Sequence, residues 1–199
     1  FIFKVYKYRI IYKKQNKNYD NIFLITSCIN QFDKNYYNHN TNHTQSQRYN
    51  ELLNTILSIK KKFFKNLFIV VVDNSKINKL MKDNLNKHVD LYIDISDKNL
   101  SNLSRLYSNK GVPWATSIMI SLNKIFEYEF SFLHIISGRY YLNNYYDIKN
   151  LKKNKFNFRY YKDFSNVSTR YFCAHNQDNK YIFNLFKKII IFIFFNISC

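Results

Sequence analysis

Three polar residues, Asp73, Asn74 and Ser75, follow directly on the uncharged, mostly β-branched run at residues 67–72. A carboxylate and an amide in a turn at the end of a buried strand can form hydrogen bonds with a ribose or with the edge of a base. The same aspartate could instead cap the helix that is expected after the turn. The residue types alone do not choose between a nucleoside site and a helix cap.

A second group of this kind, Ser137, Gly138 and Arg139, ends the apolar run at residues 130–136. A guanidinium offers paired donors and a permanent charge to a diphosphate. A glycine lets backbone amides come close to phosphate oxygens. The alternative is that Arg139 forms a structural salt bridge and that Gly138 only ends a strand.

Glycine, proline and tryptophan are scarce in the 199 residues. The two glycines, the one proline and the one tryptophan are Gly111, Gly138, Pro113 and Trp114. Lys, Asn, Ile, Tyr and Phe dominate the rest, a bias typical of an AT-rich genome. Because the two glycines have resisted this bias, they indicate a ligand site between residues 108–115 and 134–142. Two structural turns are the competing explanation.

The chain is strongly basic, with a net charge of +18 from 31 Lys and Arg against 13 Asp and Glu. Such an excess is compatible with nucleic acid, and the many Tyr and Phe side chains could stack on bases. The lysines, however, are scattered along the chain, whereas a nucleic-acid footprint gathers on one face. Solvated lysines are the preferred interpretation, and a basic, aromatic-rich nucleic-acid-binding protein is the alternative.

The cysteines and histidines give no metal-site pattern. Cys28, Cys173 and Cys199 are odd in number and lack ligand spacing, which favours reduced thiols over a disulfide framework. His39 and His43 lie in the polar stretch at residues 31–47, where we expect a solvated loop.

One apolar run, at residues 189–195, lies near the end of the sequence. It is far shorter than the ~20 residues that span a bilayer. We expect a buried strand, with a membrane-surface anchor or the out-of-frame end of a broken gene as alternatives. The expected location is therefore cytoplasmic or membrane-peripheral, without a transmembrane helix.

Strands and helices are expected to alternate along the chain. Short apolar runs predict strands at residues 22–29, 67–73, 89–95 and 130–136. Apolar periodicity and caps predict helices over 52–63, preceded by a capping box at Thr44 and Gln47, over 76–87, and from Pro113 onward. This order predicts one α/β domain with a mixed, mainly parallel sheet, whose central strands are 23–28, 68–72 and 130–136. In such sheets ligands bind beyond the carboxyl ends of the strands.

Several segments resemble glycosyltransferases of the GT-A fold, especially the large inverting family 2. Residues 68–75, FIVVVDNS, resemble the second strand of that family, whose aspartate, here Asp73, holds the nucleotide of a sugar-nucleotide donor. Residues 23–27 resemble the first strand, whose end, here Thr26 and Ser27, meets the nucleobase. The helix at residues 48–59 carries the typical TI-x-SI ending. Together with the two segments described next, the resemblance covers residues 22–142.

Two further segments carry the resemblance into the phosphate-binding region. Asn109, Lys110 and Gly111 resemble the segment that closes over the nucleotide. Residues 133–143 resemble the KISGRYFLN segment of a divergent branch. Most GT-A enzymes carry Asp-x-Asp after this strand, and the chain instead has Ser137-Gly138-Arg139. This departure argues against a bound Mn²⁺ or Mg²⁺ and gives Arg139 the catalytic task of stabilising the departing nucleotide diphosphate.

The resemblance implies a GT-A-like single domain over residues 1–199. Residues 22–142 would form the nucleotide-sugar-binding half and residues 143–199 a partial acceptor half, with the chain expected to be truncated at its C-terminal end. The implied activity is transfer of a sugar from a nucleotide-diphosphate donor to a glycan or lipid-linked acceptor. Asp147 and Asp163 are candidate bases without motif support. A catalytically inactive remnant of such an enzyme is a further alternative.

Overall fold

The architecture comes from a computed structural model, which describes residues 9–10, 18–30, 43–63, 65–97, 99–105, 111–144, 146–147, 149, 151, 157–160, 167–178 and 181–188. The strands are β1 (Arg9–Ile10), β2 (Asn18–Ser27), β3 (Leu67–Asp73), β4 (Leu91–Asp94), β5 (Glu129–Ser137), β6 (Asn157–Tyr160) and β7 (Val167–His175). The helices are α1 (Gln45–Lys62), α2 (Lys79–Asn86), α3 (Asn99–Arg105), α4 (Gly111–Ile125) and a helix at residues 181–188, with the 3-10 turn η2 (Asn176–Asp178) before it.

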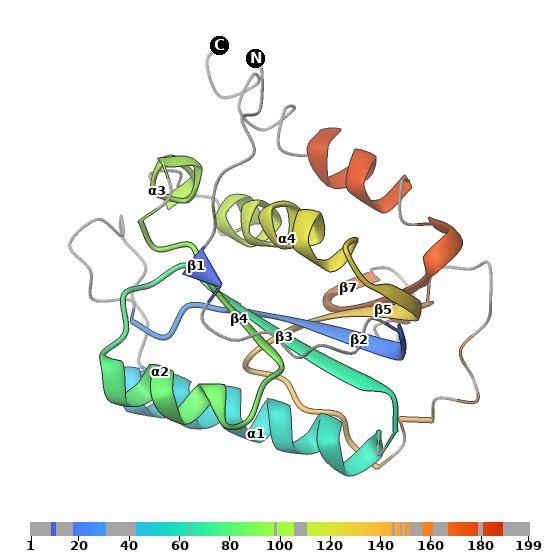
Figure 1. Cartoon of the computed structure of the whole chain (residues 1–199), viewed down its shortest axis with the longest axis horizontal. Helices are drawn as coiled ribbons and strands as arrows, with labels where there is room; N and C mark the ends of the chain where they lie inside the picture. The colour runs from blue at the N-terminus through green and yellow to red at the C-terminus, as the bar shows by residue number, and fades with distance from the viewer. Residues whose placement is uncertain are drawn as a thin grey trace.

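One seven-stranded sheet forms the centre of the fold, in the order β1-β4-β3-β2-β5-β7-β6 (Figure 1). The four inner strands β4, β3, β2 and β5 are parallel, and β1, β7 and β6 add antiparallel edges. The three strands predicted to be central, now β2, β3 and β5, are adjacent in the middle. The expected α/β class with a mixed sheet is confirmed.

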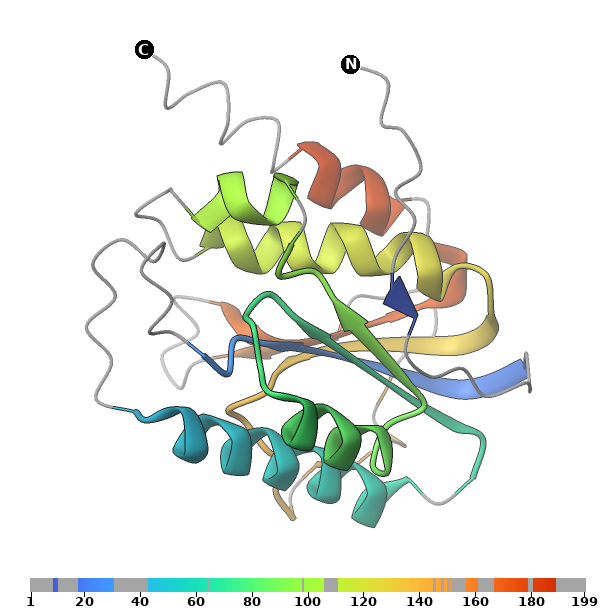
Figure 2. The same cartoon turned by 60° about the vertical axis from the view of Figure 1, so that its left-hand side comes forward.

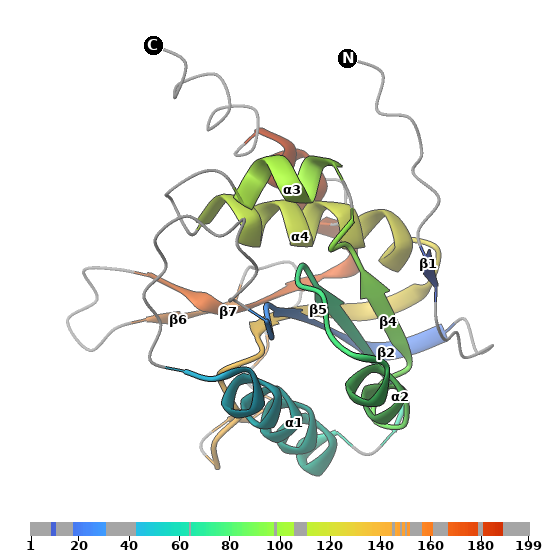
Figure 3. The same ribbon diagram turned by 90° about the vertical axis from the view of Figure 1, so that its left-hand side faces the viewer.

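Helices cover both faces of this sheet. Helices α1 and α2 lie on one face, and α3, α4 and the helix at 181–188 lie on the other (Figures 1, 2 and 3). Crossovers between parallel strands are right-handed. The chain places β3 and β4 on one side of β2 and then places β5 on the other side of β2. Because the hand of the crossover stays the same while its direction reverses, the connecting helices lie on opposite faces of the sheet.

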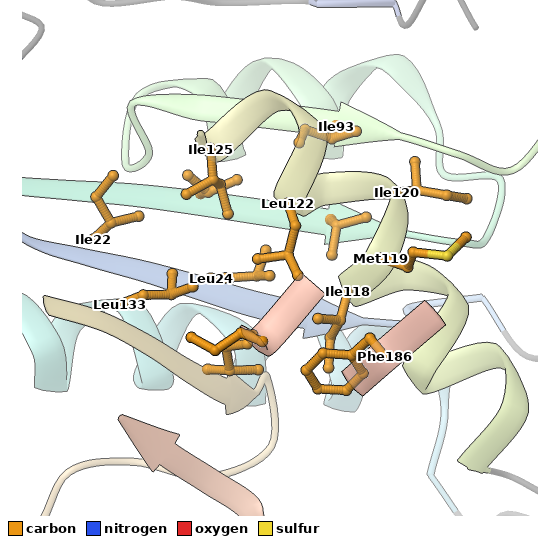
Figure 4. Close-up of a cluster of buried hydrophobic side chains, with 14 of the residues drawn as sticks. Ile22, Leu24, Ile93, Ile118, Met119, Ile120, Leu122, Ile125, Leu133 and Phe186 are labelled. Carbon is orange, nitrogen blue, oxygen red and sulfur yellow. The ribbon is translucent and has the colours of Figure 1, made fainter. Parts of the chain in front are cut away.

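The inner strands are apolar on both sides because each side faces a helical layer. Alternate residues of β2 show this: Ile22 and Leu24 face α4, whereas Phe23 and Ile25 face α1. All four are fully buried. The core beneath α4 also receives Phe186 from the helix at 181–188 (Figure 4).

Helix α1 begins as its sequence predicts. Thr44 is the N-cap and accepts a hydrogen bond from the Gln47 amide, and the Gln47 side chain accepts one from the Thr44 amide. Leu52, Ile56 and Ile59 then form the buried face. This reciprocal cap satisfies backbone donors that a helix start leaves unpaired.

The other predicted helices and strands among the described residues are present, but some begin or end at different residues than predicted. Helix α2 starts at Lys79 instead of residue 76 because Asn78 provides its cap, accepting from the Met81 amide at 2.9 Å. Strand β4 is shorter than predicted, at Leu91–Asp94. The antiparallel strands β1, β6 and β7 have no counterpart in the sequence-based prediction. The run at 189–195 and most of the stretch at 31–47 lie outside the described residues.

Candidate functional site

The carboxyl ends of the inner strands form a row of polar residues. In the strand register, Thr26 of β2 pairs with Ser137 of β5, Ser27 pairs with Asp73 of β3, and Asp73 pairs with Asp94 of β4. The strand order reverses between β2 and β5, because β3 and β4 extend to one side and β5 follows on the other. Ligands of open α/β sheets bind at such a reversal, outside the carboxyl ends. We take this edge as the candidate site.

Asp73 is fully buried at this edge. Its Oδ1 accepts hydrogen bonds from the Ser75 amide at 2.7 Å and from the Ser75 hydroxyl at 2.5 Å. Its Oδ2 accepts one from the Ile29 amide at 3.2 Å. Burial raises the pKa of Asp73 above its ordinary value, against the opposing effect of these hydrogen bonds.

These contacts give Asp73 a positioning role, since it ties the loop after β2 to the turn after β3. Ser75 strengthens the link, because its hydroxyl accepts a hydrogen bond from the Asn30 amide at 2.9 Å. Neither Asp73 nor Ser75 has any exposed surface, and Asn74 has little. The structure shows that Asp73 holds the backbone of Ile29 and Ser75. Direct contact between Asp73 and a nucleoside stays a prediction.

Asp94 repeats this arrangement on the next strand. Its Oδ1 accepts hydrogen bonds from the Ser96 amide at 3.0 Å and the Ser96 hydroxyl at 2.6 Å, and its Oδ2 pairs with the Lys82 ammonium of α2. Burial by itself would raise the pKa of Asp94, but the bonds from Lys82 and Ser96 outweigh it and lower the pKa. The charge of this carboxylate is therefore already compensated within the protein.

Gly138 is explained by packing between the sheet and α1. A Cβ atom at Gly138 would lie 2.9 Å from Leu52 Cδ1 and 3.4 Å from the Thr26 carbonyl oxygen. Its backbone has no positive φ, and its amide donates to the Thr26 carbonyl at 2.9 Å. The Gly138 amide is thus already engaged, and the glycine makes room for a leucine, while an approach of the surrounding backbone to a phosphate stays a prediction.

Arg139, by contrast, is exposed directly beside the strand reversal. Within the described part of the chain, no carboxylate forms an ion pair with its guanidinium. The structural salt bridge considered as an alternative is thus absent from these residues. Ser137, which precedes it, is partly exposed, so the end of β5 presents a hydroxyl beside a cation that has no ion-pair partner among the described residues.

The structure brings most of the predicted site residues to this edge: Thr26, Ser27, Asp73, Asn74, Ser75, Ser137, Gly138 and Arg139. Asn109 and Lys110 lie outside the described residues. Gly111 is the first residue of α4 and is exposed. Asn30 was not predicted, although its place three residues after the end of β2 could have suggested it.

The two candidate bases gain no support. Asp163 lies outside the described residues. Asp147 follows a segment that runs back along α1, because the Leu142 amide bonds to Ser58 and the Lys62 ammonium bonds to the Asn144 carbonyl at 3.3 Å. Lys62 ends α1 at the opposite edge of the sheet. The segment thus carries Asp147 away from Arg139.

No group of three or more metal-ligating side chains occurs among the described residues. The two remaining aspartates near the edge, Asp94 and Asp97, are paired with Lys82 and, at 3.1 Å, with Lys76. Each of these two carboxylates is thus already engaged by a lysine.

A buried polar cluster beneath β5 was missed by sequence reasoning. His134 Nε2 lies 2.9 Å from Asn21 Oδ1, and its Nδ1 lies 2.9 Å from the Tyr171 hydroxyl, which lies 2.7 Å from that of Tyr146. Burial lowers the pKa of His134 to about 3 and raises that of the neighbouring Cys173 thiol. A nucleophilic Cys–His pair needs a lowered thiol pKa. The cluster therefore fits a neutral, structural role.

A groove of about 520 Å³ lies at the other edge of the sheet, where β3 begins. Its lining includes Lys60, Phe63, Asn66, Lys87 and His88, from the ends of α1 and α2 and the turns that follow them. Lysines close to helix C-termini also compensate the helix dipole. The predicted site residues are at the opposite edge and do not line this groove.

No protein-family model matches the chain, and no curated protein matches it. Among the described helices, none combines the length and the apolar character needed to cross a membrane.

Proposed function

We propose that this protein binds a nucleotide-activated sugar at the carboxyl ends of β2, β3 and β5 and transfers the sugar to a glycan or lipid-linked acceptor. The observation that carries the proposal is the exposed Arg139 guanidinium, without an ion-pair partner in the described chain, at the reversal of strand order. An unpaired guanidinium at a site of this topology suits a diphosphate, which it can bind through two parallel hydrogen bonds.

The nucleoside half of the donor would lie over the loop that follows β2 and the turn that follows β3. Asp73 and Ser75 hold the backbone of Ile29 and Asn30, so the start of this loop is fixed before a ligand arrives. Thr26, Ser27 and Asn74 would meet the base and ribose, as the resemblance to GT-A enzymes implies. Pre-ordering supports binding because the loop loses less conformational freedom when the nucleotide arrives.

In the transfer step, the bond between the anomeric carbon and the diphosphate oxygen breaks, and its electron pair remains on the diphosphate. Arg139 would stabilise this growing negative charge, in the place where metal-dependent GT-A enzymes use a cation. The acceptor hydroxyl attacks the anomeric carbon and gives up its proton to a base.

The decisive experiment is calorimetric titration of the wild type and Arg139→Ala with uridine and guanosine diphosphates, with and without a chelator. Binding that survives the chelator and weakens by about tenfold or more in Arg139→Ala supports the proposal. Lys87→Ala removes an exposed cation near the opposite edge and is the matched control. Absence of binding by the wild type to every nucleotide would favour the inactive remnant, and equal binding by both variants would remove Arg139 from the site.

A further inference from the structure

The helix at residues 181–188 exposes apolar side chains beside a buried face. Ile182 and Phe186 are buried, and the Phe186 ring lies 5.8 Å from Trp114 of α4 and 5.9 Å from Phe172 of β7, centroid to centroid. These contacts fix the helix on the protein. Tyr181 and Leu185, four residues apart and therefore on one side of the helix, are 62% and 40% exposed.

This helix lies on the outer side of the α4 layer, away from α1 and α2 (Figures 1 and 2). Its exposed side chains are therefore on the surface of the molecule that is remote from the other helical layer. The large exposed side chains Leu57 and Leu80 belong to α1 and α2 on that other layer. Leu57 and Leu80 can therefore serve as controls for Tyr181 and Leu185, because all four are large, exposed apolar side chains and the two pairs lie on opposite layers.

The sequence of the helix and of the residues that follow it is basic and apolar and contains no acidic residue. The helix ends in Lys187 and Lys188, Lys180 precedes it, and residues 179–199 contain no Asp or Glu. The apolar run Ile-Ile-Ile-Phe-Ile-Phe-Phe follows the two lysines directly in the sequence. An acidic protein partner would use the lysines but not the apolar run. A surface with an apolar interior and anionic head groups uses both.

We propose that the helix at 181–188 docks on an anionic lipid surface. Tyr181 and Leu185 would enter the boundary between head groups and acyl chains, and Lys188, seven residues after Tyr181 and on the same side of the helix, would contact the anionic head groups. The net charge of +18 provides long-range attraction to the same surface.

The test is co-sedimentation of the full chain with vesicles of phosphatidylcholine, alone or with about a third phosphatidylglycerol. The wild type should bind the anionic vesicles, and salt should weaken binding. Lys188→Gln should reduce the partition coefficient about fivefold. The double variant Tyr181→Ser/Leu185→Ser should reduce it by roughly tenfold, with the lysines unchanged.

The matched control is Leu57→Ser/Leu80→Ser, which removes two exposed apolar side chains from the opposite layer. It should bind like the wild type, and circular dichroism should show that every variant is folded. Equal losses in both double variants, or equal binding to neutral and anionic vesicles, would overturn the proposal. Failure of the folded wild type to bind anionic vesicles would also overturn it, and would point to residues 189–199 or a second copy as the cover, which sedimentation velocity distinguishes.

Discussion

Asp73 and Asp94 face each other across β3 and β4 in the strand register, and each accepts two hydrogen bonds from the serine two residues later. The same Asp-x-Ser turn thus ends two neighbouring parallel strands. Their surroundings differ: the Asp73 carboxylate has only neutral hydrogen-bond donors, whereas Asp94 also pairs with the Lys82 ammonium. Burial therefore dominates at Asp73 and raises its pKa, while the lysine and serine bonds prevail at Asp94 and lower its pKa.

The two carboxylates should make opposite contributions to the pH dependence of stability. Asp94 has a lowered pKa, so it stabilises the fold above the ordinary carboxyl pKa, and this contribution is lost as the pH falls through the folded value. Asp94→Asn should therefore lower the free energy of unfolding at pH 7 and have less effect below about pH 4.

Asp73 should show the reverse trend. Its raised pKa means that stability is greatest below the unfolded pKa and falls as the pH rises through the folded value. Asp73→Asn should thus become less destabilising, relative to the wild type, between about pH 4 and pH 7. Urea unfolding across this range measures both variants. Parallel pH profiles for the two would contradict the assigned environments.

His134 should contribute to acid sensitivity. The folded pKa of about 3 is below the ordinary imidazole value, so the unfolded chain binds a proton first as the pH falls. Stability associated with His134 is present above about pH 6.5 and declines toward pH 3. His134→Gln should have a flatter stability profile over this interval, at the cost of lower stability at pH 7. An NMR titration in which the His134 ring protonates near pH 6.5 would contradict the prediction.

Gly138 and Leu52 should be energetically coupled. Gly138→Ala places a Cβ 2.9 Å from the buried Leu52 Cδ1, which we expect to lower the free energy of unfolding by about 1–3 kcal/mol. Leu52→Val removes a methylene near the clash, so the two changes together should cost less than the sum of their separate effects. Additive costs in this double-mutant cycle would show that packing against α1 is not the reason for the glycine.

Transfer activity should depend on Arg139 and not on a divalent cation. We expect turnover to survive a chelator and to fall by about 100-fold or more in Arg139→Ala. Arg139→Lys should restore little of it, because a point charge cannot reproduce the paired hydrogen bonds of the guanidinium. Full dependence on Mn²⁺ or Mg²⁺ with an active Arg139→Ala would overturn the mechanism and direct attention to Asp94 or Asp97 as metal ligands.

The sequence by itself determined the elements whose signals are local. The capping box at Thr44 and Gln47, the apolar face of α1 and the runs that form β2, β3 and β5 each lie within a few turns of chain. Alternation of these runs with helices then predicted parallel neighbours. Polar residues at the strand ends had to meet at one edge, because parallel strands end on the same side of a sheet.

Only the tertiary structure decided which of those polar residues are accessible and with which residues they pair. Asp73 accepts a hydrogen bond from an amide 44 positions earlier in the chain, and His134 bonds to a side chain 113 positions away. Lys82 finds Asp94 only after α2 packs beside β4, while Arg139 finds no carboxylate among the described residues. Desolvation and ion pairing depend on distances in space, which a local pattern of residue types does not encode. The sequence therefore predicted where the candidate site lies, and the packing decided that Asp73 is buried there while Arg139 is exposed.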